Sequence, residues 1–219
     1  MKKLIFGYGA TGKSVESYFQ KNKIKYFIHD DKDLDIENDL IFKKEKFNEI
    51  DEVIISPGIK PTNPMLNEIN SQGLTINTDI DLFNKVYKGK IIGVTGTNGK
   101  TTFVNLLTDY LNLHQIKSIA VGNVGKSPLE IVGENFEYVV MELSSFQLYY
   151  LNNINLFKAI VLNIFEDHLD WHSDFEDYRN AKLKIFKFAP KNEILLLMNQ
   201  EQSIQKSIVK NYYLNHQEF

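Results

Sequence analysis

Short apolar runs alternate with segments of helical periodicity along most of this chain. In its first part, four runs are predicted to be strands: Lys3 to Phe6, Tyr26 to Ile28, Val53 to Ile55 and Leu74 to Ile76. Amphipathic patterns at Ser14 to Gln20 and Pro64 to Ile69 are predicted to be helices. Strand-sized runs separated by helices are typical of a parallel α/β sheet, which is the fold class that we predict.

A second series of runs begins at Lys90. It includes Ser118 to Val121, Tyr138 to Met141, Ala159 to Leu162 and Glu193 to Leu197. The polar junction from Lys85 to Lys90 separates the two series, and each series opens with a strand followed by a glycine-rich turn. We therefore predict a Rossmann-like domain over residues 1–88 and a partial P-loop NTPase-like domain over residues 89–219.

Composition excludes several classes of protein. The chain has 219 residues, a net charge of −3, 43% apolar residues and no cysteine, so disulfides and thiolate metal sites are excluded. No basic arm suggests a nucleic acid partner. The apolar runs, such as Ile194 to Met198, are far shorter than the roughly 20 residues of a membrane span. The N-terminal run ends at Gly7, too early for a secretory signal, so the cytoplasm is the default expectation. A monomer is also expected, but the sequence does not determine the oligomeric state.

The segment Gly93 to Thr102, GVTGTNGKTT, predicts a site for a nucleoside triphosphate. Backbone N–H groups of Gly96, Thr97, Asn98 and Gly99 can surround phosphate oxygens at the start of a helix. Lys100 is expected to reach the outer phosphates, and the hydroxyl of Thr101 is expected to reach magnesium. Thr102 completes the set of predicted nucleotide-binding residues. Val94 occupies the position of the first glycine in the usual P-loop, so this loop is a variant.

A second glycine turn, GYGATG, joins the first strand to the first helix through Gly7, Gly9 and Gly12. Asp30 and Asp31 end the next strand, where a carboxylate can bind a sugar hydroxyl. This pattern fits an NAD-type ligand, a UDP-type ligand or a purely structural turn. The two glycine turns together suggest that a nucleotide-carrying substrate meets a nucleoside triphosphate.

Polar residues follow two apolar strands of the second series. Glu142 follows Tyr138 to Met141 and is a candidate magnesium ligand, although an exposed glutamate at a strand end is common. The segment NIFEDHLDWH, residues 163–172, brings Asn163, Asp167, His168, Asp170 and His172 to the same expected edge. His168 is a candidate for binding metal or phosphate, and capping a helix is the simpler alternative.

The predicted helix from Phe175 to Ala189 places a lysine in its apolar stripe. Lys182 lies among Phe175, Tyr178, Phe186 and Ala189, whereas Lys184 and Lys187 are expected to face solvent. Burial would lower the pKa of Lys182 and make its neutral amine available for reaction. A lysine whose stem covers apolar surface is the alternative, and periodicity alone favours it.

Together, GVTGTNGKTT, MELSSFQL at 141–148, NIFEDHLDWH and YRNAKLKIF at 178–186 resemble the Mur ligase family. SSFQL and the N-terminal GYGATG are most similar to the branch that adds D-glutamate to UDP-N-acetylmuramoyl-L-alanine. The resemblance implies a cytoplasmic ATP- and Mg²⁺-dependent enzyme of peptidoglycan synthesis. In that chemistry, ATP phosphorylates the substrate carboxylate, and the amine of D-glutamate displaces phosphate.

The resemblance also implies roles for matching residues. Lys100 would bind ATP phosphates, Thr101 and Glu142 one magnesium, and His168 a second, while Lys182 would carry a carbamate that reaches toward the metal. The residues matched to substrate binding are Gly9, Ala10, Thr11, Asp30 or Asp31, Ser56, Pro57 and Gly58 on the UDP side, with Asn123 and Ser144 near the muramoyl peptide.

Family members have a complete central domain followed by a third domain. The central domain of this sequence looks unfinished, and nothing in the sequence resembles the third domain. We therefore expect a fragment that binds ligand but does not complete ligation. The alternatives are a Mur ligase with another acceptor amino acid, a nicotinamide-dependent dehydrogenase, and a non-catalytic nucleotide-binding module. A dehydrogenase would leave GTNGKTT without a purpose.

Overall fold

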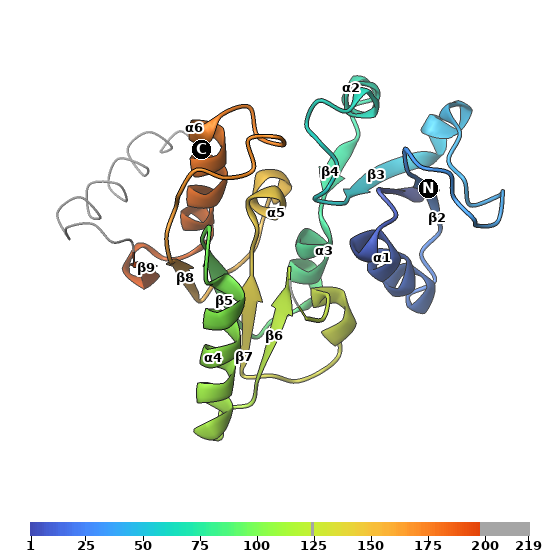
Figure 1. Cartoon of the computed structure of the whole chain (residues 1–219). Coiled ribbons are helices and arrows are strands. Elements are labelled where there is room, and N and C mark those ends of the chain that lie inside the picture. Colours follow the sequence, from blue (N-terminus) through green and yellow to red (C-terminus); the bar gives the residue numbers. More distant parts are fainter. Residues whose placement is uncertain (124, 198–219) are drawn as a thin grey trace. The chain divides into compact units, whose positions relative to one another are not determined.

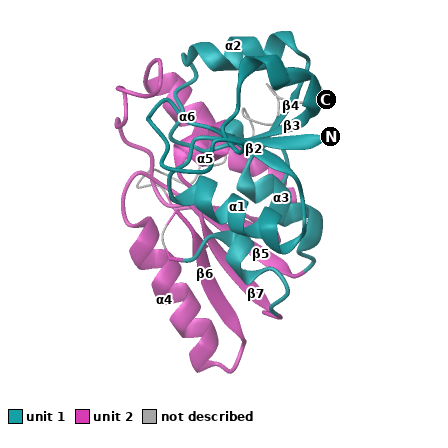
Figure 2. Cartoon of the chain, turned by 90° about the vertical axis from the view of Figure 1, so that its right-hand side faces the viewer, with its two compact units in different colours: residues 1–88, 126–134, 150–154 teal, residues 89–125, 135–149, 155–219 magenta. Residues whose placement is uncertain are grey.

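The computed structural model describes residues 1–123 and 125–197, and its two sheets are both parallel (Figure 1). Contacts group the chain into two compact units (Figure 2). The first unit contains residues 1–88 together with two later segments, 126–134 and 150–154. The second contains residues 89–125, 135–149 and the described residues from 155 onward. The two later segments of the first unit were not predicted from the sequence.

The first unit is built on a four-stranded sheet in the order β2-β1-β3-β4. Its strands are β1 (Lys2–Phe6), β2 (Tyr26–His29), β3 (Ile50–Ile55) and β4 (Thr75–Asn77). Its helices are α1 (Ala10–Lys21), α2 (Pro64–Ser71) and α3 (Asp79–Val86), with the 3₁₀ segments η1 (Lys44–Glu49) and η2 (Pro128–Ile131). The four predicted strands are therefore confirmed, each within a few residues, whereas α3 was missed.

Alternation along each strand directs apolar side chains to both faces of this sheet. One face carries a cluster that includes Leu4, Phe6 and Val53, against which Met65 and Leu66 of α2 pack. Ile5 points to the other face, where a methyl group added to Gly12 of α1 would lie 3.4 Å from its side chain. The helices thus cover both faces, as expected for a parallel sheet.

The second unit contains a five-stranded sheet in the order β6-β7-β5-β8-β9. Its strands are β5 (Lys90–Thr95), β6 (Ser118–Gly122), β7 (Tyr138–Glu142), β8 (Lys158–Val161) and β9 (Ile194–Leu196). The helices are α4 (Lys100–Leu113), α5 (Ser145–Tyr150) and α6 (Phe175–Leu183), followed by η3 (Lys184–Phe188) and η4 (Lys191–Glu193). The parallel α/β class is confirmed; the predicted run Ile194 to Met198 ends outside the described residues.

Helix α4 packs on one face of this sheet through Val104, which joins a buried cluster with Val94 and Val140. The other face is so closely packed at Gly93 that an added methyl group would lie 2.7 Å from Leu156. Ile185 of η3 also reaches this position, at 3.3 Å. Because α6 ends at Leu183 and continues as η3, the predicted single helix to Ala189 is wrong in its second half.

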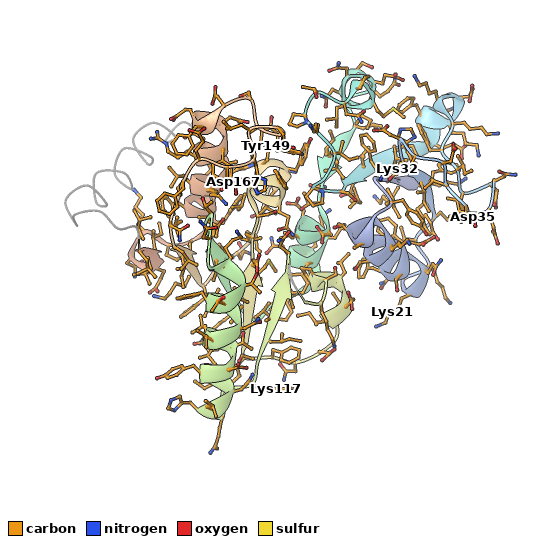
Figure 3. The ribbon with its side chains drawn as sticks, in the orientation of Figure 1. Lys21, Lys32, Asp35, Lys117, Tyr149 and Asp167 are labelled. Carbon is orange, nitrogen blue, oxygen red and sulfur yellow. The ribbon has the colours of Figure 1, made fainter. Side chains whose placement is uncertain are left out.

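The carboxyl ends of β5, β7 and β8 open toward the same edge of the second sheet, because the strands are parallel. Figure 3 places Asp167 at this edge and Lys117 at the opposite one. Within residues 1–123 and 125–197, no helix is both long and apolar enough to cross a membrane.

Candidate functional site

The phosphate loop joins β5 to α4, as predicted. Gly99 is the residue before the helix and has a φ of 79°, a left-handed conformation that glycine adopts without strain. No side chain caps this helix end, and its first turn carries no acidic residue. The N–H groups at the start of α4, including those of Lys100, Thr101 and Thr102, therefore form a favourable position for an anion.

Thr97 and Asn98, which precede Gly99 in the loop, are bonded to the segment that follows β8. Their backbone N–H groups donate to the side-chain oxygen of Asn163, at 3.0 and 2.9 Å. The Thr97 hydroxyl accepts from the N–H of Phe165 at 2.9 Å and lies 2.9 Å from the hydroxyl of buried Tyr178. These two predicted nucleotide-binding residues thus use their amides within the protein.

Two lysines converge on Gly96. Lys100 donates to the carbonyl oxygens of Gly96 and Thr97 at 2.8 and 2.9 Å, and Lys182 donates to that of Gly96 at 2.8 Å. Burial lowers the pKa of Lys100. Burial, and then the charge of Lys100, lower the pKa of Lys182 to about 7. Of the two alternatives considered for Lys182, the structure shows the buried one, which periodicity alone did not favour: the residue is 2% exposed, with its amine over the ring of Tyr178.

The neighbouring lysines behave differently. Lys187 is exposed, as predicted. Lys184 was expected to face solvent, but it is half-buried and donates to the carbonyl oxygen of Tyr149 at 2.8 Å. The change from α-helix to 3₁₀ geometry after Leu183 alters the direction of the side chains that follow, which a constant helical period cannot anticipate.

Glu142 ends β7 and is 2% exposed. Its carboxylate accepts from the hydroxyl of Thr101 at 2.9 Å and from the side-chain amide of Asn123 at 3.2 Å. Two hard oxygen donors, a hydroxyl and a carboxylate, therefore lie side by side next to the phosphate loop. Mg²⁺ usually takes one or two such protein ligands and completes its shell with phosphate and water, so these residues fit that ion.

The surroundings of His168 differ from those of this pair of donors. Its backbone φ is 55°, its side chain is 46% exposed, and its ring packs edge-on against Phe146. Its Nε2 lies 3.4 Å from the carboxylate of Asp167. Asp167, which was expected at this edge but was given no role, favours the charged form of both Lys100 and Lys182. In the described part of the chain, no group of three or more His, Asp or Glu side chains forms a metal cluster.

Two residues predicted to contact the substrate have internal partners. The side chain of Asn123 holds Glu142, as described above. Ser144 caps α5: its hydroxyl and its N–H both donate to the side-chain oxygen of Gln147, at 3.0 and 2.9 Å. Gln147 is buried, and a capping pair of this kind was visible in the sequence as a serine followed three residues later by glutamine.

The first unit has a cavity of about 710 Å³ at the carboxyl end of its sheet. It is lined by the predicted substrate residues Gly9, Ala10, Thr11, Asp30, Asp31, Ser56, Pro57 and Gly58. Lys13 and Lys32 also line it, and Figure 3 shows Lys32 and Asp35 on the loop after β2. Helix α1 begins after Gly9 without a side-chain cap, so this cavity combines a helix N-terminus with two lysines and four aspartates.

The two candidate aspartates differ in their surroundings. Asp30 accepts from the backbone N–H of Tyr8 at 2.6 Å and from that of Lys32 at 2.9 Å, so it fixes the glycine turn. Asp31 has a side chain that is 61% exposed and accepts from Asn63 at 2.7 Å. Ser56 donates to the carbonyl oxygen of Gly7 at 2.7 Å and holds the turn from β3. Asp31 is therefore the more accessible carboxylate for a ligand hydroxyl.

Two protein-family models match the chain. The Mur ligase middle domain matches residues 94–217, which is more than half of the chain. The N-terminal domain of MurD-like Mur ligases matches residues 1–78. Each match contains one of the two glycine turns.

Curated relatives agree with these matches. UDP-N-acetylmuramoylalanine--D-glutamate ligase of Thermotoga petrophila is 37% identical over 193 residues, covering 82% of this chain and 45% of that protein. The enzyme of the same name from Helicobacter pylori is 35% identical, covering 100% of this chain and 53% of that protein. The chain thus spans about half the length of the curated relatives it matches.

Solved structures support the fold. UDP-N-acetylmuramate:L-alanyl-gamma-D-glutamyl-meso-diaminopimelate ligase from Neisseria meningitides has a TM-score of 0.60 at 18% identity, covering 96% of this chain and 75% of that one. A murein peptide ligase from Psychrobacter arcticus has a TM-score of 0.52 at 14% identity, covering 96% and 51%. At these identities the likeness concerns the arrangement of the elements.

Proposed function

The chain belongs to the Mur ligase family, and from that membership we propose that it holds the two nucleotides of an ATP-dependent amide ligase. The proposed whole activity adds D-glutamate to UDP-N-acetylmuramoyl-L-alanine in the synthesis of peptidoglycan precursors. The observation that carries this proposal is the convergence of Lys100, Lys182, Thr101 and Glu142 around one phosphate loop. The relatives named for this reaction support the choice of substrates.

In the proposed reaction, a carboxylate oxygen of the substrate attacks the terminal phosphorus of ATP, and ADP leaves. The amine of D-glutamate then attacks the carbonyl carbon of the acyl phosphate and loses a proton, and inorganic phosphate leaves with the electrons of the broken C–O bond. Lys100 and the first N–H groups of α4 would bind and orient the phosphates. Mg²⁺, held by Thr101 and Glu142, would neutralise their charge.

Lys182 is proposed to act in a modified form. Its low pKa leaves a large fraction of the side chain as neutral amine near pH 7. The nitrogen lone pair can then form a bond to the carbon of CO₂, with loss of a proton, which yields a carbamate anion. That change converts a buried neutral amine beside Lys100 into an anion, which the positive charge of Lys100 stabilises. His168 is proposed to assist metal binding.

We propose that the cavity of the first unit binds the UDP portion of the substrate. The diphosphate would approach Gly9 and the N-terminus of α1, with Lys13 and Lys32 balancing its charge. The exposed carboxylate of Asp31 would accept a hydrogen bond from a ribose hydroxyl. Neither a nicotinamide nor a nucleic acid partner is part of this proposal, and we expect a cytoplasmic monomer.

Binding of the two nucleotides is the direct test of this chain, and amide formation is the test of the proposed whole activity. We expect a UDP-sugar and ATP with Mg²⁺ each to raise the melting temperature. Lys100→Met should abolish the shift caused by ATP and keep that caused by the UDP-sugar. Lys117→Met, which changes an exposed lysine at the opposite edge of the sheet, should keep both. Absence of any shift with ATP in the wild-type chain would contradict the proposal.

A further inference from the structure

The carboxamide of Asn163 forms a bridge between the end of β8 and the phosphate loop. Its oxygen accepts the N–H groups of Thr97 and Asn98, and its nitrogen donates to the carbonyl oxygen of Asn98 at 3.0 Å. The backbone carbonyl of Asn163 also accepts from the N–H of Thr97 at 3.0 Å. One half-buried residue thus bonds to N–H groups and to a carbonyl group of the same short backbone segment.

The backbone of the loop lies directly against the same strand end. A methyl group added to Gly96 would be 3.1 Å from the Cβ of Leu162 and 3.5 Å from backbone atoms of Asn163. The bond between the N–H of Phe165 and the hydroxyl of Thr97 extends the contact to the next turn. Residues 96–98 and 162–165 are therefore joined by close packing as well as by hydrogen bonds.

These contacts divide the phosphate loop into two parts. The N–H groups of Thr97 and Asn98 point to Asn163 and are used there. After them, Gly99 turns the chain through its left-handed conformation into α4, whose first turn has no side-chain cap. The N–H groups that can meet a phosphate are those at the start of α4, and their direction depends on how the preceding residues are held.

We propose that Asn163 is a positioning residue of the nucleotide site: it fixes residues 97–98, and through Gly99 it sets the direction of the amides and of Lys100 that bind the phosphates. Asn163 itself makes no contact with the nucleotide in this proposal. The inference rests on the proposed function, because it assigns a role within the same ATP site. It also explains why an asparagine follows β8, since a carboxamide supplies both an acceptor and a donor.

Asn163→Ala removes the three side-chain hydrogen bonds and leaves the backbone bond in place. Loss of preorganisation at a phosphate loop should weaken ATP binding by about tenfold to a hundredfold. Asn112→Ala is a matched control, because Asn112 bonds to the N–H and the carbonyl oxygen of Ser118 at the far end of α4. It lies about 18 Å along the helix from Lys100.

The test measures ATP affinity, with Mg²⁺ present, by titration calorimetry for the wild-type chain and both variants. We expect both variants to lower the melting temperature and Asn163→Ala alone to weaken ATP binding. The shift caused by a UDP-sugar should be the same in all three proteins. Equal ATP affinity in wild type and Asn163→Ala would overturn the proposal, as would an equal loss in both variants.

Amide hydrogen exchange in the wild-type chain tests the bridge without nucleotide. Slow exchange at Thr97 and Asn98, compared with faster exchange at Gly99, would support the proposal even if Asn163→Ala fails to fold. Fast exchange at Thr97 and Asn98 would overturn it. A wild-type chain that does not bind ATP would contradict the proposed function instead, while the exchange result still decides whether the bridge exists.

Discussion

Lys100 and Lys182 donate to the same carbonyl oxygen, that of Gly96, at 2.8 Å each. Two ammonium groups held this close repel each other, and the repulsion adds to the cost of burying Lys182. The geometry favours a state in which Lys182 is neutral or negatively charged. The protonation of Lys182 therefore depends on the positive charge of Lys100, the residue proposed to bind the phosphates.

The first prediction concerns pH. The pKa of Lys182 is about 7 in the folded protein against 10.5 as its ordinary value, so between these pH values the unfolded chain binds the extra proton. The free energy of unfolding should rise with pH across that window by up to about 1.4 kcal/mol per pH unit, and the penalty should be constant below about pH 7. Lys182→Met should lose this slope, and its advantage over wild type should shrink as pH rises.

This comparison is made by urea denaturation from pH 7 to 10 in buffers free of bicarbonate. Lys187→Met, which changes an exposed lysine on the same segment, serves as the control and should keep the wild-type slope. Equal slopes in wild type and Lys182→Met would show that Lys182 remains charged in the folded protein.

The second prediction concerns the metal. Glu142→Gln removes the charge next to Thr101 while keeping its shape. We expect ATP affinity measured with Mg²⁺ to fall by about tenfold or more, whereas affinity measured with EDTA should change little. Glu137→Gln, an exposed carboxylate just before the start of β7, is the control. A loss of the same size with and without Mg²⁺ would argue against Glu142 as a metal ligand.

The third prediction separates binding from folding in the glycine turn of the first unit. A methyl group at Gly9 has no atom within 4 Å, and this residue has a negative φ of −76°. At Gly12 the methyl group would lie 2.2 Å from the carbonyl oxygen of Gly7. Gly9→Ala should therefore fold normally and lose the thermal shift caused by a UDP-sugar. Gly12→Ala should instead lower the free energy of unfolding by about 2 kcal/mol or more. Retention of the full shift in Gly9→Ala would place the diphosphate elsewhere.

The fourth prediction concerns a buried acid in α3. Burial raises the pKa of Asp79 to about 6, and its Oδ1 has no hydrogen-bond partner within the described structure. Because the folded protein holds this proton more tightly, stability should fall as pH rises from about 4 to 6. Asp79→Asn should remove that decrease and raise the free energy of unfolding at pH 7 by about 1–3 kcal/mol.

Asp81 provides the opposite case. Its carboxylate accepts four donors: the N–H and hydroxyl of Thr78, and the N–H groups of Asn152 and Asn153. Asp81→Asn should lower the free energy of unfolding by about 1–3 kcal/mol in the same denaturation experiment. Two variants that shift stability in the same direction would contradict this account of the helix start.

Local sequence patterns predicted the parts of the site that depend on one segment. The glycine turns and Lys100 follow from spacing within a strand and a turn. The helical period placed Lys182 in the apolar stripe, but by itself it favoured a lysine that only covers apolar surface, and the structure shows that Lys182 is buried. The bridge from Asn163 to Thr97 and Asn98 depends instead on the pairing of β5 with β8, residues far apart in the chain. Asn163 was visible as one of several polar residues after a strand, but no period distinguished it from its neighbours.

Other differences have similar causes. The resemblance matches Ser144 to substrate binding, which stays a prediction; in addition, its hydroxyl caps α5 with Gln147, as the spacing of serine and glutamine indicates. Asp79 and Asp81 lie in the first turn of α3, a helix that was not predicted. Their burial reflects contacts that the order of residues does not reveal, since segments 126–134 and 150–154 pack with the first unit.

That packing sets an order of events during biosynthesis. The amide groups that satisfy Asp81 belong to Asn152 and Asn153, which leave the ribosome long after α3. A nascent chain therefore cannot complete the four hydrogen bonds to Asp81 until residue 153 has been translated, which is after the phosphate loop. The two units are interleaved along the chain, although each unit has its own sheet.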